Sequence, residues 1–288
     1  MTASLRQLVD FPMRWLRWQA RRGKVRIKAG RINTPTLFAN SFPKSGTHLL
    51  TQVLAGFSEL GPFVNTGWNA VTMFDGPTGR LRPQMEILRA IKRLRAGDLG
   101  YGHLHATPEI SAALSRPDMS SFFILRDPRD VVVSHVYYVT ELEPNHVHHR
   151  YYVDALTSFG ERLQASILGR PELANPFPDI TGRFAPYLGW LENERVLTLR
   201  FEDFITARED TLGRVYDHVA LNGFSYSGGR EKAVGKLSAM IDPERSPTFR
   251  TGKVGGWQEN FTPAIKDLFK EVTGDLLVRL GYEKDQDW

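Results

Sequence analysis

A lysine lies in a short loop between an apolar run and an amphipathic run. Residues 36–42, which read Thr-Leu-Phe-Ala-Asn-Ser-Phe, favour a buried strand, and leucine, valine and phenylalanine recur at helical spacing from Leu49 to Phe57. The loop between them reads Pro43-Lys44-Ser45-Gly46-Thr47. Backbone N–H groups at the positive end of a helix, together with the charge of Lys44, would bind a phosphate or sulfate group. The alternative is an ordinary strand–turn–helix junction.

An arginine and a serine lie eight residues apart around a second strand-to-helix junction. Residues 121–126 favour a buried strand that ends at Arg126, and Asp127-Pro128-Arg129-Asp130 is typical of a helix start. Ligands of α/β sheets bind at the carboxyl ends of the strands, and an arginine can chelate a phosphate there. We therefore interpret Arg126 and Ser134 as a second anion site, against the alternative of a surface arginine and a solvated serine.

A third segment combines basic residues with glycines near the carboxyl end of the chain. It reads Phe249-Arg250-Thr251-Gly252-Lys253-Val254-Gly255-Gly256-Trp257. Such a loop could fold over an anion, or it could be a surface loop anchored by its tryptophan.

The elements that must position these residues alternate between strand and helix. Residues 99–105 indicate a short strand or turn and residues 195–200 a further strand, while helices are predicted over 83–96, 209–220 and 229–240. Residues 141–182 are predicted to be irregular because of Pro144, Pro171 and the run 175–178. This alternation predicts an α/β fold, a central parallel sheet with crossover helices.

Taken in order, the three segments resemble the motifs of sulfotransferases that use 3′-phosphoadenosine-5′-phosphosulfate (PAPS). In that family the first loop reads Pro-Lys-Ser-Gly-Thr-Thr-Trp, an arginine precedes a serine by eight residues, and a glycine-rich loop ends in Trp-Lys-x-x-Phe-Thr. The resemblance covers about residues 36–283. It implies a three-layer, P-loop NTPase-like fold and PAPS as co-substrate, with no metal required. The residues it implies for PAPS are Lys44, Ser45, Gly46, Thr47, His48, Arg126, Ser134, Phe201, Arg250, Thr251 and Gly252.

The resemblance also implies two catalytic residues. His103, in Gly102-His103-Leu104-His105, matches the family's base, and Lys44 would stabilise the charge of the leaving group. The predicted reaction is transfer of a sulfuryl group from PAPS to a hydroxyl or amine of a small-molecule, saccharide or lipid-linked acceptor. His105 stands where the family has proline and is an alternative base.

Several positions depart from the family pattern. His48 and Leu49 replace Thr-Trp, Phe201 replaces a tyrosine, and Thr251 replaces a phosphate-binding lysine. Ala239 stands where an aromatic residue could stack on adenine. These changes leave the adenine contacts open, and a broken dimerisation signature leaves the oligomeric state open.

Charge is concentrated in a basic head, residues 1–31, ahead of a predicted single domain over 32–288. The head holds nine basic residues and one acidic residue, so its formal charge is +8, and the rest of the chain carries −3 of the total of +5. This distribution argues against nucleic-acid binding by a general basic face. Three interpretations of the head stay open: a helix on an anionic membrane surface, a docking segment, or a frayed tail.

Composition narrows the class of protein further. The chain has 288 residues and no cysteine, which excludes disulfides and fits a reducing compartment, so we expect a cytoplasmic protein with peripheral membrane contact as one option.

Three histidines, His146, His148 and His149, lie close together in the sequence. A metal site is the weaker interpretation of this segment, and the alternative is a loop that faces the acceptor. Two other functions are considered: a P-loop-type nucleotide kinase or NTPase, and an inactive relative that binds without catalysis.

Overall fold

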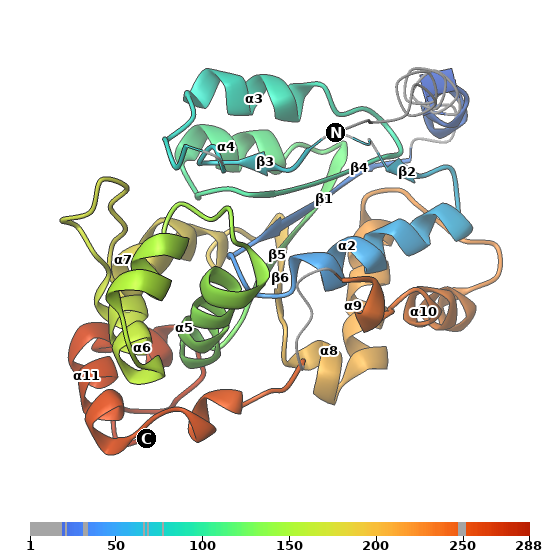
Figure 1. Ribbon diagram of the computed structural model, residues 1–288. Coiled ribbons are helices and arrows are strands. Elements are labelled where there is room, and N and C mark those ends of the chain that lie inside the picture. The colour runs from blue at the N-terminus through green and yellow to red at the C-terminus, as the bar shows by residue number, and fades with distance from the viewer. Residues whose placement is uncertain are drawn as a thin grey trace, which may run out of the picture.

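A parallel β-sheet forms the centre of the molecule (Figure 1). The computed structural model describes residues 19–20, 22–30, 34–65, 67, 69–76, 78–246 and 252–288. The strand order is β2-β4-β1-β5-β6, with β3 also paired to β4, and every pair is parallel. The strands are β1 (Thr36–Ser41), β2 (Val64–Asn65), β3 (Val71–Thr72), β4 (Asp98–His103), β5 (Met119–Leu125) and β6 (Val196–Arg200).

Strand β1 lies between β4 and β5 and is buried along its whole length. Its side chains alternate between two apolar cores, with Phe38 in one and Leu37 and Ala39 in the other. A strand covered on both faces favours apolar residues, as at Leu37, Phe38 and Ala39, while the buried Asn40 bonds to the backbone of Leu104.

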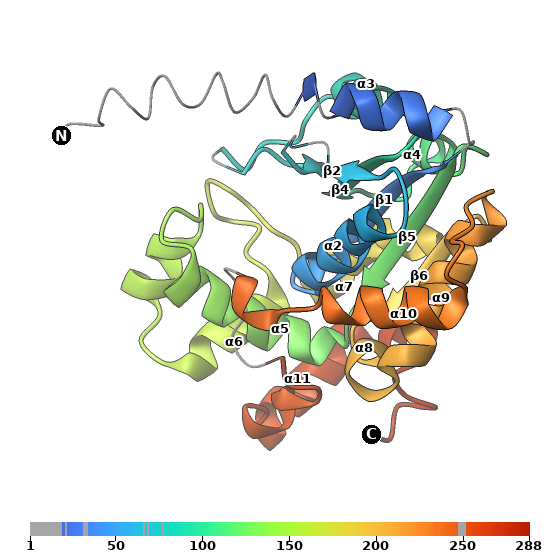
Figure 2. The ribbon, with the colours of Figure 1, turned by 90° about the vertical axis from the view of Figure 1, so that its right-hand side faces the viewer.

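Helices cover both faces of the sheet (Figures 1 and 2). One core packs against α2, α9 and α10, and the other packs against α3 to α7 and α11. The helices are α2 (Thr47–Gly56), α3 (Gln84–Lys92), α4 (Pro108–Leu114), α5 (Pro128–Tyr137), α6 (Phe159–Leu168), α7 (Ile180–Phe184), α8 (Asp203–Thr206), α9 (Arg208–Leu221), α10 (Arg230–Ala239), α11 (Pro263–Thr273) and α12 (Leu276–Arg279). The predicted three-layer α/β architecture is confirmed.

The helix start at Asp127 is confirmed, although three valines follow it. The Asp127 carboxylate accepts the N–H of Arg129 at 2.9 Å, and α5 begins at Pro128. The cap and the proline fix the backbone at this junction, so the strand propensity of Val131, Val132 and Val133 is overridden.

The prediction that residues 141–182 are irregular is wrong in part. Helix α6 lies inside this range and begins with a reciprocal capping box between Ser158 and Glu161. Two π-helical turns, Tyr138–Leu142 and Tyr151–Ala155, lie on either side of the predicted histidine segment. The capping pair was visible in the sequence, but the neighbouring prolines and glycines obscured it.

Part of the basic head packs on the sheet. Residues 22–30 are helical, and Arg22 donates to both oxygens of the Asp98 carboxylate at 2.9 and 2.8 Å. Arg26 pairs with the same carboxylate, which is fully buried at the start of β4. Among the described residues, no helix has the length and apolar character needed to cross a membrane.

Candidate functional site

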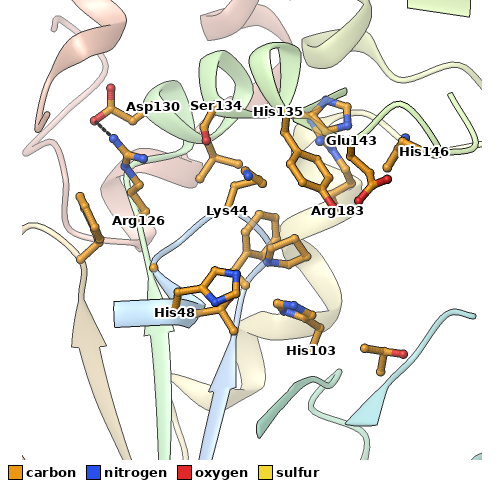
Figure 3. A pocket seen from close by; sticks show the side chains of 18 of the residues that line it. Lys44, His48, His103, Arg126, Asp130, Ser134, His135, Glu143, His146 and Arg183 are labelled. Atoms are coloured by element: carbon orange, nitrogen blue, oxygen red, sulfur yellow. Dashed lines mark hydrogen bonds and ion pairs between the residues drawn. The ribbon is translucent and has the colours of Figure 1, made fainter. Parts of the chain in front are cut away.

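The carboxyl ends of four adjacent strands open into one cavity. Lys44 follows β1, His103 ends β4, Arg126 follows β5 and Phe201 follows β6. Because parallel strands end at the same edge of a sheet, residues far apart in sequence meet here. All four line a cavity of about 990 Å³. Figure 3 shows Lys44 and Ser134 between Arg126 at one end and Arg183 at the other.

The loop after β1 has an unusual backbone. Lys44 has a φ of 69° and Gly46 a φ of 95°, both in the left-handed region, and α2 begins directly afterwards at Thr47. A Cβ on residue 46 would lie 2.7 Å from Cδ2 of Phe201, so only glycine fits. The loop therefore holds the Lys44 side chain at the helix N-terminus, as an anion site requires.

Lys44 is a partly buried cation at this helix start. Its Nζ lies 3.8 Å from the centre of the Tyr138 ring. Burial, with a smaller contribution from the charge of Arg126, lowers the pKa of Lys44 to about 8. The neighbouring Ser45 is fully buried, and its Oγ lies beneath the loop without a hydrogen-bond partner among the described residues. Ser45 thus supports the loop from below, while Gly46, Thr47 and His48 line the cavity.

His103 is oriented by the end of β1. Its Nδ1 lies 2.9 Å from the carbonyl oxygen of Ser41 and 3.1 Å from Ser41 Oγ, which in turn contacts Thr47 Oγ1 at 2.8 Å. A carbonyl can only accept, so Nδ1 carries the proton and Nε2 keeps its lone pair in the neutral ring. Burial is the main reason that the pKa of His103 lies below its ordinary value, so the ring is neutral at pH 7.

Arg126 is fixed by three neighbours. It donates to the Asp130 carboxylate at 3.2 Å and to the carbonyl of Lys253 at 2.7 Å, and its guanidinium lies 4.6 Å from the centre of the Phe201 ring. Its Nε is buried and has no partner among the described residues. Arg126 thus keeps a donor without a partner among the described residues, and Ser134 lines the same cavity.

Asp130 connects this arginine to the glycine-rich segment near the C-terminus. Its carboxylate accepts the N–H of Gly255 at 3.0 Å and of Trp257 at 2.8 Å. The segment is therefore held against α5, and Gly252 reaches the cavity wall. Arg250 and Thr251, which were also predicted to bind the ligand, lie outside the described residues.

The end of the cavity beyond Lys44 is lined by histidines and by Arg183. His105, His146 and His148 line the cavity, whereas His149 bonds to the carbonyl of Val139 at 2.7 Å. Among the described residues, no group of three histidines and carboxylates is placed to hold a metal ion. His135 and Arg183 were not singled out from the sequence, because nothing in their own segments indicates a shared cavity.

Comparison with known proteins places this geometry in context. The family model of the sulfotransferase domain matches residues 35–281. Retinol dehydratase in complex with androsterone and the inactive cofactor PAP is 16% identical, with a TM-score of 0.57 over 85% of this chain and 82% of that chain. Mouse sulfotransferase SULT7A1 complexed with PAP is 19% identical, with a TM-score of 0.56 over 88% of this chain and 90% of that chain. The search of curated proteins found no match. At these identities the structural likeness establishes a shared fold.

Proposed function

This chain belongs to the sulfotransferase family, and we propose that it transfers a sulfuryl group from PAPS to a hydroxyl or amine of an acceptor. One observation carries the proposal. Two cationic sites, Lys44 and Arg126, and a neutral histidine, His103, face the same cavity from adjacent strands. Retinol dehydratase and the mouse sulfotransferase, which share the fold, are complexed with PAP, the desulfated form of PAPS.

The two anionic ends of PAPS would fit the two cationic sites. The loop residues Lys44, Gly46, Thr47 and His48, which line the cavity, would hold the 5′-phosphosulfate at the start of α2, whereas the predicted ligand residue Ser45 is fully buried and does not line it. At the other end Arg126 and Ser134 would hold the 3′-phosphate, with Arg250, Thr251 and Gly252 closing over it, and the ring of Phe201 lies between the two sites.

The chemistry follows from the proton states of the two catalytic groups. His103 Nε2 accepts the acceptor's proton while the acceptor oxygen forms its bond to sulfur. The bond between sulfur and the bridging phosphate oxygen breaks, and Lys44 stabilises the negative charge that develops on that oxygen. The products are the sulfated acceptor and PAP, and the proton stays on His103 until solvent removes it.

Two other functions have specific but weaker support. Asp127 follows β5 as a Walker B aspartate would, but its carboxylate caps α5 and pairs with Arg129 at 2.7 Å, which occupies it. The departures from the family pattern at Leu49 and Phe201 support the other interpretation, an inactive relative that binds PAPS without catalysis. Retention of Lys44 and His103 favours an enzyme.

Calorimetry and a transfer assay test the proposal together. We expect PAP to bind at micromolar or lower concentration without added metal, and Mg·ATP to bind much more weakly. Radiolabelled sulfate should then pass from PAPS into a panel of phenol, saccharide and lipid-linked acceptors. Tight binding of Mg·ATP alone would overturn the proposal, whereas PAP binding without transfer to any acceptor would favour the inactive relative.

The acceptor and the cellular location belong to the same proposal. The acceptor is taken to be a small molecule, a saccharide or a lipid-linked alcohol, and the cytoplasm is the proposed compartment. Peripheral membrane contact through residues 1–31 would favour a lipid-linked acceptor. Co-sedimentation of the full chain with anionic and neutral vesicles measures that contact directly.

A further inference from the structure

Arg183 is a cation without an acidic partner at the far end of the cavity. It lies on α7 and donates to the carbonyl of Ser166, while its Nε is buried and unbonded among the described residues. No described carboxylate oxygen lies within 4.0 Å of its guanidinium nitrogens. Asp179 attracts it from a distance, but that carboxylate caps α7 by accepting the N–H of Gly182 at 2.7 Å.

Arg183 faces a side cavity that reaches Lys44. The side cavity measures about 190 Å³, and its lining includes Lys44, Arg183, His135, His146 and His148. Figure 3 shows Arg183 beside His135 and His146, with Glu143 close by. Glu143 lines the main cavity but not the side cavity, and its Oε1 accepts the N–H of Asn145 at 3.2 Å. The lining of the side cavity is therefore positive.

Hydrogen bonds leave the Nε2–H of one lining histidine, His146, without an acceptor among the described residues. His146 Nδ1 accepts the N–H of His148 at 3.2 Å, so in the neutral ring of His146 the proton is on Nε2. His148 instead uses its Nε2–H on the carbonyl of Asn175, at 2.7 Å. Burial and the neighbouring positive charges lower the pKa of His146 to about 4, so the ring is a neutral donor at pH 7. Arg183 Nε and His146 Nε2 thus each offer an N–H that has no acceptor among the described residues.

Arg183 is partly buried, its Nε is fully buried, and it has no ion-pair partner among the described residues, so it carries a desolvation cost that a bound anion would offset. We propose that Arg183 and His146 form an anion subsite at the acceptor end of the cavity. The acceptor is then a hydroxyl compound that carries a second, anionic group such as a carboxylate, sulfate or phosphate. This inference rests on the proposed sulfuryl transfer, because it takes the far end of the cavity as the acceptor end.

Matched probes test the subsite without requiring turnover. The protein is saturated with PAP, and calorimetry compares 4-hydroxyphenylacetate, 4-hydroxyphenylmethanesulfonate and the uncharged methyl 4-hydroxyphenylacetate. We expect each anion to bind at least about tenfold more tightly than the ester, the effect of one charge-assisted hydrogen bond. A preference for the sulfonate indicates a tetrahedral natural group, and a preference for the carboxylate indicates a planar one.

Variants assign the preference to the two residues. In Arg183→Gln the anions should bind within about twofold of the ester, while affinities for PAP and for the ester stay unchanged. His146→Phe keeps the guanidinium and should lose part of the preference, which covers the case in which Arg183→Gln fails to fold. Arg116→Gln, at a surface ion pair with Asp118, is the control and should retain the full preference.

The calorimetry separates failure of the anion subsite from failure of the proposed function. If PAP binds but the anions bind no better than the ester, or do not bind at all, the subsite is wrong and the proposed function stands. If the wild-type protein fails to bind PAP, the proposed function itself is wrong.

Discussion

His103 is positioned by the backbone of another strand. Because its Nδ1 is held by the carbonyl of Ser41, only Nε2 can act toward the cavity. We expect His103→Gln to lower kcat for sulfuryl transfer by about 10²–10⁴-fold, the usual contribution of a general base. PAP affinity, measured by calorimetry, should be unchanged. His105→Gln serves as the control, and a larger loss there than in His103→Gln would move the base to His105.

The pH dependence of transfer should reflect two partly buried groups, His103 and Lys44. His103 has a pKa below its ordinary 6.5, so the base form persists at neutral pH and is lost only in more acidic solution. Lys44 has a pKa of about 8, so its charge is lost as the pH rises through that value. We expect kcat/KM for PAPS to fall on both sides of neutrality.

The alkaline limb can be assigned by substitution. Arginine stays charged at all accessible pH values, so Lys44→Arg should remove the fall near pH 8 while lowering the maximal rate. The measurement is kcat/KM from about pH 5 to about pH 10. An unchanged alkaline limb in this variant would mean that another group titrates there.

Sequence reasoning found the residues that lie in motifs and missed those defined by their neighbours. Lys44, Arg126 and His103 each follow or end an apolar strand, so the rule for parallel sheets places them at one edge. Arg183 carries no such signal, because what marks it is that no described carboxylate forms an ion pair with it, and only the folded structure shows this. Asp130 could be predicted as a helix residue, but its partners Gly255 and Trp257 come 125 and 127 positions later.

At the scale of elements, α5 and the glycine-rich segment form one unit through Asp130. Asp130→Asn keeps the size of the side chain but removes the charge that accepts two backbone N–H groups and pairs with Arg126. We expect PAP affinity to fall by about tenfold or more, since charge-assisted bonds are involved. Hydrogen exchange should increase at Gly255 and Trp257.

A surface aspartate provides the matched control for this prediction. Asp154→Asn changes an exposed carboxylate in the π-helical turn Tyr151–Ala155 and should leave both PAP affinity and exchange unchanged. If Asp130→Asn binds PAP as tightly as the wild type, the link between α5 and the segment does not contribute to the ligand site.

Element boundaries were predicted well where a strand or cap is strong. The predicted strands at 36–42, 121–126 and 195–200 lie within one or two residues of β1, β5 and β6. Helix α6 is not predicted because Gly169-Arg170-Pro171 and the run 175–178 follow its capping residues, Ser158 and Glu161, and Pro144 precedes them. Local turn signals outweighed the cap in the prediction, although packing of α6 against α5 decided the structure.

At the scale of the whole molecule, the N-terminal helical segment is attached by a buried ion pair. The side chains of Arg22 and Asp98 are 2% and 0% exposed. We expect Arg22→Gln to lower the free energy of unfolding by about 3 kcal/mol, because Arg26 alone would then neutralise the buried carboxylate. Urea denaturation measures this change. Lys24→Gln, an exposed position in the same segment, should have no measurable effect.

The central place of β1 has a consequence for synthesis on the ribosome. This strand emerges early, yet both of its partners come much later: Leu37 pairs with Leu99 on one side and with Ser120 on the other. Contacts so distant in sequence form slowly, and an apolar strand with open edges attracts other chains. Until translation passes Leu125, the growing polypeptide has nothing of its own to cover both edges of β1. During that interval the open edges of β1 can pair with other chains, so co-translational aggregation is the expected hazard.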